Sequence, residues 1–119
     1  MIQLFDASDI ATQYKDTPCT LSLQFLIRNN QLDMYTMMRS NDAFVGLPHD
    51  IFVFTMLQEI IARRVGIAMG SYTHFVTSMH LYLDDFDKAV QFKEEGFMPL
   101  EPVMPVSYTH LTLPTTPYV

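Results

Sequence analysis

The sequence is poor in cysteine and in basic residues, and both shortages narrow the range of functions that the protein can have. Cys19 is the single cysteine among 119 residues, so an intrachain disulfide is excluded and a reducing, cytoplasmic setting is expected. Seven Lys and Arg oppose thirteen Asp and Glu, which gives a net charge of −6. This balance argues against a nucleic-acid polymer as partner, because such binding needs a basic face. A small phosphorylated ligand stays open, since one or two arginines suffice for it.

Long apolar runs are also missing. The longest, "IFVFTML", is interrupted by Gln58 and Glu59, so no membrane span is expected. The first residues, "MIQLFDASDIA", carry acids and no basic cluster, which does not match a signal peptide. Walker loops, GxGxxG and nucleophile elbows do not occur. At 49% hydrophobic, the chain can bury a core and is expected to form a single small domain.

Strand and helix patterns alternate along the chain. "TLSLQFLI" (20–27) and "LDMYTMM" (32–38) predict two strands joined by the turn "RNNQ". Apolar residues at helical spacing predict a helix from Ile51 to Val65, between the start signal Pro48 and the stop signal Gly66. Residues 70–83 favour a strand, and 84–97 a short amphipathic helix that stops at Gly96. This mixture indicates an α/β (α+β) fold.

The predicted hairpin carries the first candidate site. With a turn near residues 29–31, residue 20 lies opposite residue 39 or 40, which places Cys19 beside Arg39 and Ser40. A guanidinium there would stabilise a thiolate and hold a phosphate or carboxylate next to it. The alternative is that Cys19 is an inert, buried apolar residue, as lone cysteines usually are.

Three segments together resemble a known family. "TPCTLSLQF", "RSNDAFVGLPHDI" and "HLY" follow one another between Pro18 and Tyr82 with the order and spacing of thymidylate synthase, around its nucleophile and nucleotide site. The resemblance implies a large twisted mixed sheet with flanking helices, of which this chain holds a partial domain. It also implies homodimers that pack sheet against sheet.

The resemblance implies a role for each matching residue. Cys19 would be the thiolate that adds to C6 of a pyrimidine deoxynucleotide monophosphate, and C5 would then take a one-carbon unit from 5,10-methylenetetrahydrofolate. No metal is implied. The other implied roles are phosphate binding by Arg39 and Ser40, activation of Cys19 by Arg39, folate binding by Asp42 and Gly46, and sugar binding by His80 and Tyr82.

Asp50 departs from the pattern, because the family has an asparagine there that reads the pyrimidine edge. An aspartate suits the amino group of cytosine better than O4 of uracil, and deoxycytidylate hydroxymethylases of the superfamily resemble this chain at that position. Two reactions therefore stay open: methylation of dUMP, as in thymidylate synthase, and hydroxymethylation of dCMP or CMP. Thr20, Met38, Thr77 and Ser78 also differ from the family's usual residues.

Simpler interpretations remain for each residue. Arg39 and Asp42 would make an ordinary surface pair, Asp50 a helix N-cap, and His80 a half-buried strand histidine. A metal site from His74, His80, Asp84 and Asp85 is a weaker alternative without clean ligand spacing.

Two further expectations concern the segments on either side of the part of the chain that resembles the family. The family's longer chain has an upstream catalytic glutamate, a tryptophan that contacts folate and arginines lent between subunits, and a closing C-terminal segment. We therefore expect residues 1–105 to be a partial domain without turnover of its own; a non-catalytic fragment that keeps a nucleotide-binding surface is the alternative. Residues 106–119, "VSYTHLTLPTTPYV", resemble a translated sequencing adapter, and we expect this non-native tail to carry no function.

Overall fold

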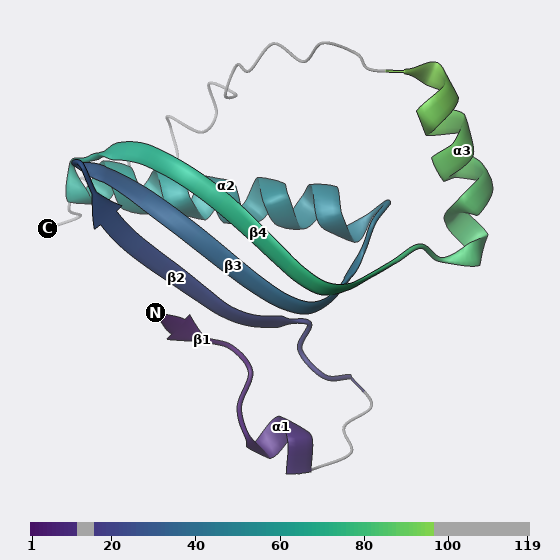
Figure 1. The fold of residues 1–119 in the computed structure, drawn as a ribbon, viewed down its shortest axis with the longest axis horizontal. Coiled ribbons are helices and arrows are strands. Elements are labelled where there is room, and N and C mark those ends of the chain that lie inside the picture. Colours follow the sequence, from purple (N-terminus) through teal and green to yellow (C-terminus); the bar gives the residue numbers. More distant parts are fainter. Residues whose placement is uncertain (12–15, 97–119) are drawn as a thin grey trace, which may run out of the picture.

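A four-stranded mixed sheet with one long helix across it forms the centre of the molecule (Figure 1). The computed structural model describes residues 1–11 and 16–96, so the expectation for residues 106–119 lies outside the described part. The strand order is β1-β2-β3-β4, antiparallel except for the parallel pair β3/β4. The elements are β1 (Ile2–Gln3), α1 (Ser8–Ala11), β2 (Thr20–Arg28), β3 (Gln31–Asp42), α2 (Gly46–Val65), β4 (Ala68–His80), the 3-10 helix η1 (Leu83–Asp85) and α3 (Phe86–Glu95).

The β2–β3 hairpin turns through Asn29 and Asn30, which have φ angles of 50° and 59°. Two-residue hairpin turns of this kind need positive φ at both central positions, and asparagine tolerates that conformation better than most residues. The turn aligns Arg28 with Gln31 and Ser22 with Met37. A bulge at Leu21 then shifts Thr20 to face Met38, so the predicted partner, residue 39 or 40, was wrong by at least one position.

Helix α2 connects the parallel strands β3 and β4 and covers one face of the sheet. On β3 the alternate residues Leu32, Met34, Thr36 and Met38 are buried. The opposite face exposes apolar side chains: Met37, Phe75 and Met79 are 45%, 56% and 48% exposed. The described part of the chain thus has one covered and one open sheet face.

The fold class predicted from the sequence is confirmed, and the boundaries need three corrections. Strand β3 continues to Asp42 instead of ending at residue 38. Helix α2 begins at Gly46 rather than Ile51, because Asp42 caps its first turn; Pro48 lies in that turn, where a proline needs no N–H donor. Strand β4 ends at His80, so Tyr82 lies beyond it. Within the described residues, no helix is long and apolar enough to span a membrane.

Candidate functional site

Arg39 holds the segment that carries Cys19. Its backbone N–H donates to the Cys19 carbonyl (2.9 Å), and its guanidinium donates to the carbonyls of Pro18 (2.9 Å) and Thr17 (2.7 Å). Nη2 also lies 3.7 Å from the Cys19 Sγ. The predicted proximity of Cys19 and Arg39 is therefore confirmed. Cys19 is exposed, so its interpretation as a buried apolar residue is wrong.

Ser40, His80 and Tyr82 form a second group at the adjoining strand ends. The Ser40 hydroxyl lies 3.2 Å from His80 Nδ1, and the rings of His80 and Tyr82 meet edge to face with centroids 4.9 Å apart. The His80 carbonyl accepts a 2.7 Å hydrogen bond from the Ala43 N–H, which ties the end of β4 to the β3–α2 turn. The hydroxyl of Ser40 thus contacts His80, and the sequence-based placement of Ser40 beside Cys19 has no contact in the structure to support it.

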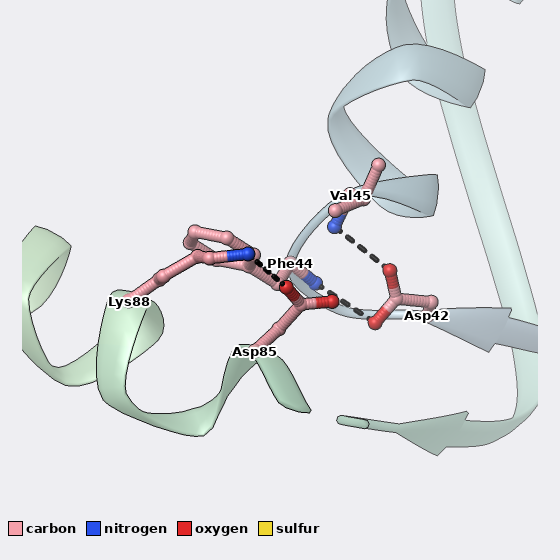
Figure 2. A network of polar contacts seen from close by, with 5 residues as sticks. All are labelled: Asp42, Phe44, Val45, Asp85 and Lys88. Carbon is pink, nitrogen blue, oxygen red and sulfur yellow. Dashed lines mark hydrogen bonds and ion pairs between the residues drawn. The ribbon is translucent and has the colours of Figure 1, made fainter. Parts of the chain in front are cut away.

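Asp42 caps helix α2 from outside its first turn (Figure 2). Its carboxylate accepts hydrogen bonds from the backbone N–H groups of Phe44 (3.3 Å), Val45 (2.8 Å) and Gly46 (3.0 Å). The Gly46 N–H foremost, then those of Val45 and Phe44, with the charge of His80, lower the pKa of Asp42 against the opposing effect of desolvation. Asp42 therefore does not form the surface ion pair with Arg39 that was the simpler alternative.

Gly46 sits where a side chain has no room. A Cβ on Gly46 would lie 2.7 Å from Oδ1 of Asn41, an amide that is itself 4% exposed. Local packing is thus sufficient to require glycine here. Beside the same turn, the Phe44 ring meets Phe92 of α3 edge to face (6.4 Å), and Lys88 pairs with Asp85 at 2.9 Å (Figure 2).

Asp50 lies one turn inside helix α2, so the interpretation as N-cap is wrong. Its charge acts on two residues of β4, Tyr72 and His74. Burial raises the pKa of Tyr72, the Thr36 hydroxyl opposes this, and the Asp50 charge adds to it. Burial lowers the pKa of His74, and the Asp50 charge opposes that shift. Asp50 therefore belongs to a polar group beneath the helix.

The sequence did not predict this polar group as a unit. Nδ2 of Asn41 lies 3.1 Å from His74 Nε2 and 3.3 Å from the sulfur of Met38, and His74 Nδ1 lies 2.7 Å from the Tyr72 hydroxyl. The even spacing of Tyr72 and His74 on a strand was the one available signal, and it was read for His74 only as a metal ligand. No group of three or more His, Cys, Asp or Glu in residues 1–11 and 16–96 has metal-binding geometry.

Known proteins resemble this chain in sequence. The family model "Thymidylate synthase" matches residues 1–103. The chain belongs to the thymidylate synthase family. It is 45% identical over 71 residues to a putative thymidylate synthase of Methanocaldococcus jannaschii, and 39% over 84 residues to the deoxyuridylate hydroxymethyltransferase of Bacillus phage SP01. These alignments cover 59% and 70% of this chain.

A solved structure shows the same fold. The thermostable thymidylate synthase A from Bacillus subtilis superposes with a TM-score of 0.71 over 82% of this chain at 24% identity. The chain spans about a third of the length of two of these proteins, 32% of the Methanocaldococcus protein and 34% of the solved chain, and 21% of the phage protein. Membership of the family and the fold follow from this; substrate and activity need separate arguments.

Proposed function

We propose that this chain carries the nucleophile and nucleotide-binding part of a pyrimidine deoxynucleotide C5 one-carbon transferase. The observation that supports this most is that Arg39 donates hydrogen bonds to the segment that carries Cys19 and lies close to the Cys19 sulfur. Nε and Nη2 of Arg39 are engaged by the Cys19 segment, whereas Nη1 has no hydrogen-bond partner among the described residues. One guanidinium thus has donors left for a phosphate while it faces an exposed thiol, with the Ser40 hydroxyl on the neighbouring residue.

The chemistry assigned to these residues begins with the thiolate. The Cys19 sulfur forms a bond to C6 of the pyrimidine, the C5–C6 double bond opens, and the electron pair makes C5 nucleophilic. Arg39 favours the thiolate and positions the phosphate, which holds C6 at the sulfur. His80 and Tyr82 bind the sugar hydroxyl. C5 would then bond to the one-carbon unit and give up its proton to a base, and the bond between that carbon and the folate nitrogen would break. A hydride from the tetrahydrofolate would complete a methyl group, or water a hydroxymethyl group, and the ring double bond re-forms as the sulfur leaves.

5,10-methylenetetrahydrofolate, the proposed co-substrate, would supply the one-carbon unit. Asp42 fits a role in holding it. A carboxylate has about four lone-pair positions, and the cap of α2 uses three, two of them on Oδ2. Oδ1 keeps a position for an N–H donor such as that of a pterin ring, and the cap fixes the direction of that position. Gly46 leaves the start of the helix bare beside it.

Protection of Cys19 from alkylation tests the proposal on this chain directly. We expect dUMP or dCMP to slow the modification of Cys19 by iodoacetamide, measured by intact mass. Inorganic phosphate should protect less, and dAMP no more than phosphate, because a purine has no free C5–C6 double bond to place at the sulfur. Equal protection by dAMP and the pyrimidine nucleotides would contradict the proposal.

Matched arginine variants control this experiment. Arg39→Ala should abolish protection by nucleotide, whereas Arg28→Ala should preserve it, since Arg28 is exposed at the far end of the same hairpin. We expect no turnover by the 119-residue chain itself, measured as folate-dependent release of tritium from a 5-tritiated nucleotide. Turnover that disappears in Cys19→Ser would show that the described residues suffice for the reaction.

A second candidate function rests on Asp50 and on the relative named as a hydroxymethyltransferase. A carboxylate accepts a hydrogen bond from the N4 amino group of cytosine, and a proton shared with N3 completes the pair; O4 of uracil would be repelled. We propose that the site accepts or prefers a cytidine nucleotide and that hydroxymethylation is the alternative reaction. Asp50→Asn should shift the preference towards dUMP. A strong preference for dUMP in the unaltered chain would defeat this candidate.

Partner and location proposals follow the same site. The open sheet face with Met37, Phe75 and Met79 supports homodimers that pack sheet to sheet, which analytical ultracentrifugation would test through Phe75→Asp. An exposed nucleophilic thiol has to stay reduced, so we propose a cytoplasmic protein. No nucleic-acid polymer or membrane is part of the proposal.

A further inference from the structure

Behind the proposed base site, hydrogen bonds link the side chains of Asn41, His74 and Tyr72 in series. The donor and the acceptor of each bond can be assigned. The Asn41 amide nitrogen has two acceptors within reach, the sulfur of Met38 and Nε2 of His74. A thioether has no hydrogen to donate, so only the NH2 end of the amide satisfies this position, and each of its two hydrogens has one acceptor. Asn41 is 4% exposed, so its amide has little access to water.

The orientation of Asn41 fixes the tautomer of His74. Because Nε2 accepts a hydrogen bond from the amide, the proton of the neutral imidazole resides on Nδ1. Nδ1–H then donates to the Tyr72 oxygen at 2.7 Å. A protonated imidazole would direct a second N–H at the Asn41 amide, which has no acceptor there. Burial also lowers the pKa of His74, in agreement with a neutral ring.

The tautomer in turn determines what Tyr72 can do. Since its oxygen already accepts from His74, the hydroxyl proton is directed away from the imidazole and is left to donate. The Thr36 hydroxyl and the Asp50 carboxylate are the two side chains that act on Tyr72 besides His74. Asp50 is the charged group that acts on both Tyr72 and His74, from helix α2 opposite the strand. Phe54 follows Asp50 by four residues, so both lie on the same face of α2. Phe54 packs near the His74 ring, with centroids 6.3 Å apart, which places the Asp50 face of the helix over this part of β4.

We propose that His74 is a positioning residue for the base-reading end of the site: Asn41 fixes it as the Nδ1–H tautomer, and it makes Tyr72 a hydrogen-bond donor towards Asp50. When a nucleotide is bound, the Tyr72 hydroxyl engages one oxygen of Asp50, and the second oxygen accepts from the ligand. The arrangement favours a base edge with an amino donor over one with a carbonyl. The assignment of Asp50 to the base rests on the proposed function, whereas the tautomer does not.

The first test is spectroscopic and needs no ligand. Long-range proton–nitrogen NMR spectra of the full chain at pH 7 should show His74 as the neutral Nδ1–H tautomer. Asn41→Asp should convert it to Nε2–H, because a carboxylate accepts from that nitrogen. Asp50→Asn should lower the pKa of His74 further, since it removes the charge that opposes the shift. A wild-type His74 that is protonated at pH 7, or protonated on Nε2, would overturn the inference.

The second test measures base preference. Affinities of dCMP and dUMP are compared by calorimetry for the wild type, Tyr72→Phe and the control Tyr35→Phe. Tyr35 is on β3, in the alternate set of positions that faces away from α2. Loss of the Tyr72 hydroxyl should shift the dCMP:dUMP ratio about fivefold towards dUMP, the change that one net hydrogen bond gives. Affinity for inorganic phosphate should not change.

The outcomes separate this inference from the proposed function. If neither nucleotide binds, the proposed function fails and the NMR result alone decides the role of His74. If nucleotides bind and Tyr72→Phe leaves the ratio unchanged, the positioning role is refuted although the proposed function stands. A ratio that changes equally in Tyr35→Phe would indicate a general effect on the sheet and would also refute it.

Discussion

Arg39 combines two tasks that usually need separate residues. Its guanidinium donates to the carbonyls of Thr17 and Pro18 and lies beside the sulfur of Cys19, so one group holds a backbone segment and contacts a thiol. Both tasks use the fixed fork of the guanidinium, which lysine lacks. The residue that is proposed to activate Cys19 is therefore also the residue that determines where Cys19 lies.

Replacement of Arg39 should change Cys19 before any ligand is involved. In Arg39→Lys, the ammonium keeps the positive charge and loses the fork, so the Cys19 segment loosens while the charge that is proposed to favour the thiolate stays near the sulfur. We expect iodoacetamide to modify Cys19 about fivefold more slowly in Arg39→Ala than in the wild type, with Arg39→Lys between them. Arg28→Ala should match the wild type. Equal rates in all four proteins would show that the guanidinium does not influence the thiol.

At the scale of the element, helix α2 depends on a cap that lies in a strand. Asp42 is the last residue of β3 and accepts hydrogen bonds from Phe44 and Val45 of the turn and from Gly46, the first residue of α2, so the strand end and the helix start form one unit. Asp42→Asn keeps the acceptor oxygen and should lower the melting temperature slightly, whereas Asp42→Ala should lower it by roughly a few degrees. Asp87→Asn, an exposed acid in the first turn of α3, is the matched control.

The Asp42 cap predicts that the stability of the fold decreases at low pH. The pKa of Asp42 is lower in the folded chain than its ordinary value of 3.8, because its backbone donors favour the charged form. Its contribution to stability is therefore complete above about pH 3.8 and is lost as the pH falls through the folded pKa. Thermal melts between pH 6 and 3 should converge for the wild type and Asp42→Ala at the acid end. A constant difference would contradict the assignment.

Gln58 joins α2 to the irregular end of the β3–β4 pair. The register shifts after Leu32, and the fully buried Gln58 donates to the carbonyls of Leu32 (2.7 Å) and Ser71 (3.0 Å). Gln58→Leu removes both bonds and should destabilise the fold by about 2 kcal/mol; loss of the amide oxygen, which is itself unpaired among the described residues, offsets part of the cost. Urea unfolding measures this. Gln24→Leu, at an exposed position of β2, should stay within about 0.5 kcal/mol.

At the scale of the whole molecule, the C-terminal tail differs from the rest of the chain in its composition. Residues 106–119 contain no charge and favour β structure, so we expect them to contribute nothing to stability and to promote aggregation. Removal of these residues should leave the melting temperature unchanged and reduce light scattering on heating. A decrease of several degrees on deletion would show that the tail packs against the domain.

The sequence predicted the fold class, the long helix and the hairpin because each has strong local signals. It placed Arg39 beside Cys19 because a two-residue turn constrains the register of the hairpin. The predicted partner of Thr20 was wrong by at least one position, because no residue type in the sequence signals the bulge at Leu21. The cap by Asp42 escaped prediction, since its partners lie in the following turn and at the first residue of the next helix. Gly70 illustrates the same limit: a Cβ there would collide with Asp33 and the Leu32 backbone, a constraint that only the paired strands create. The roles of the site residues stay predictions.

The spacing of the site's contacts along the chain has a consequence for the order of folding. The contact between Cys19 and Arg39 spans 20 residues and closes with the hairpin, whereas that between Ser40 and His80 spans 40 and requires α2 to cross the sheet first. Local pairs form sooner than distant ones, because they lose less loop entropy. Amides of β2 and β3 should gain protection from hydrogen exchange before those of β4. During refolding, the half of the site that holds the Cys19 sulfur thus exists before the half that is proposed to bind the sugar of its substrate.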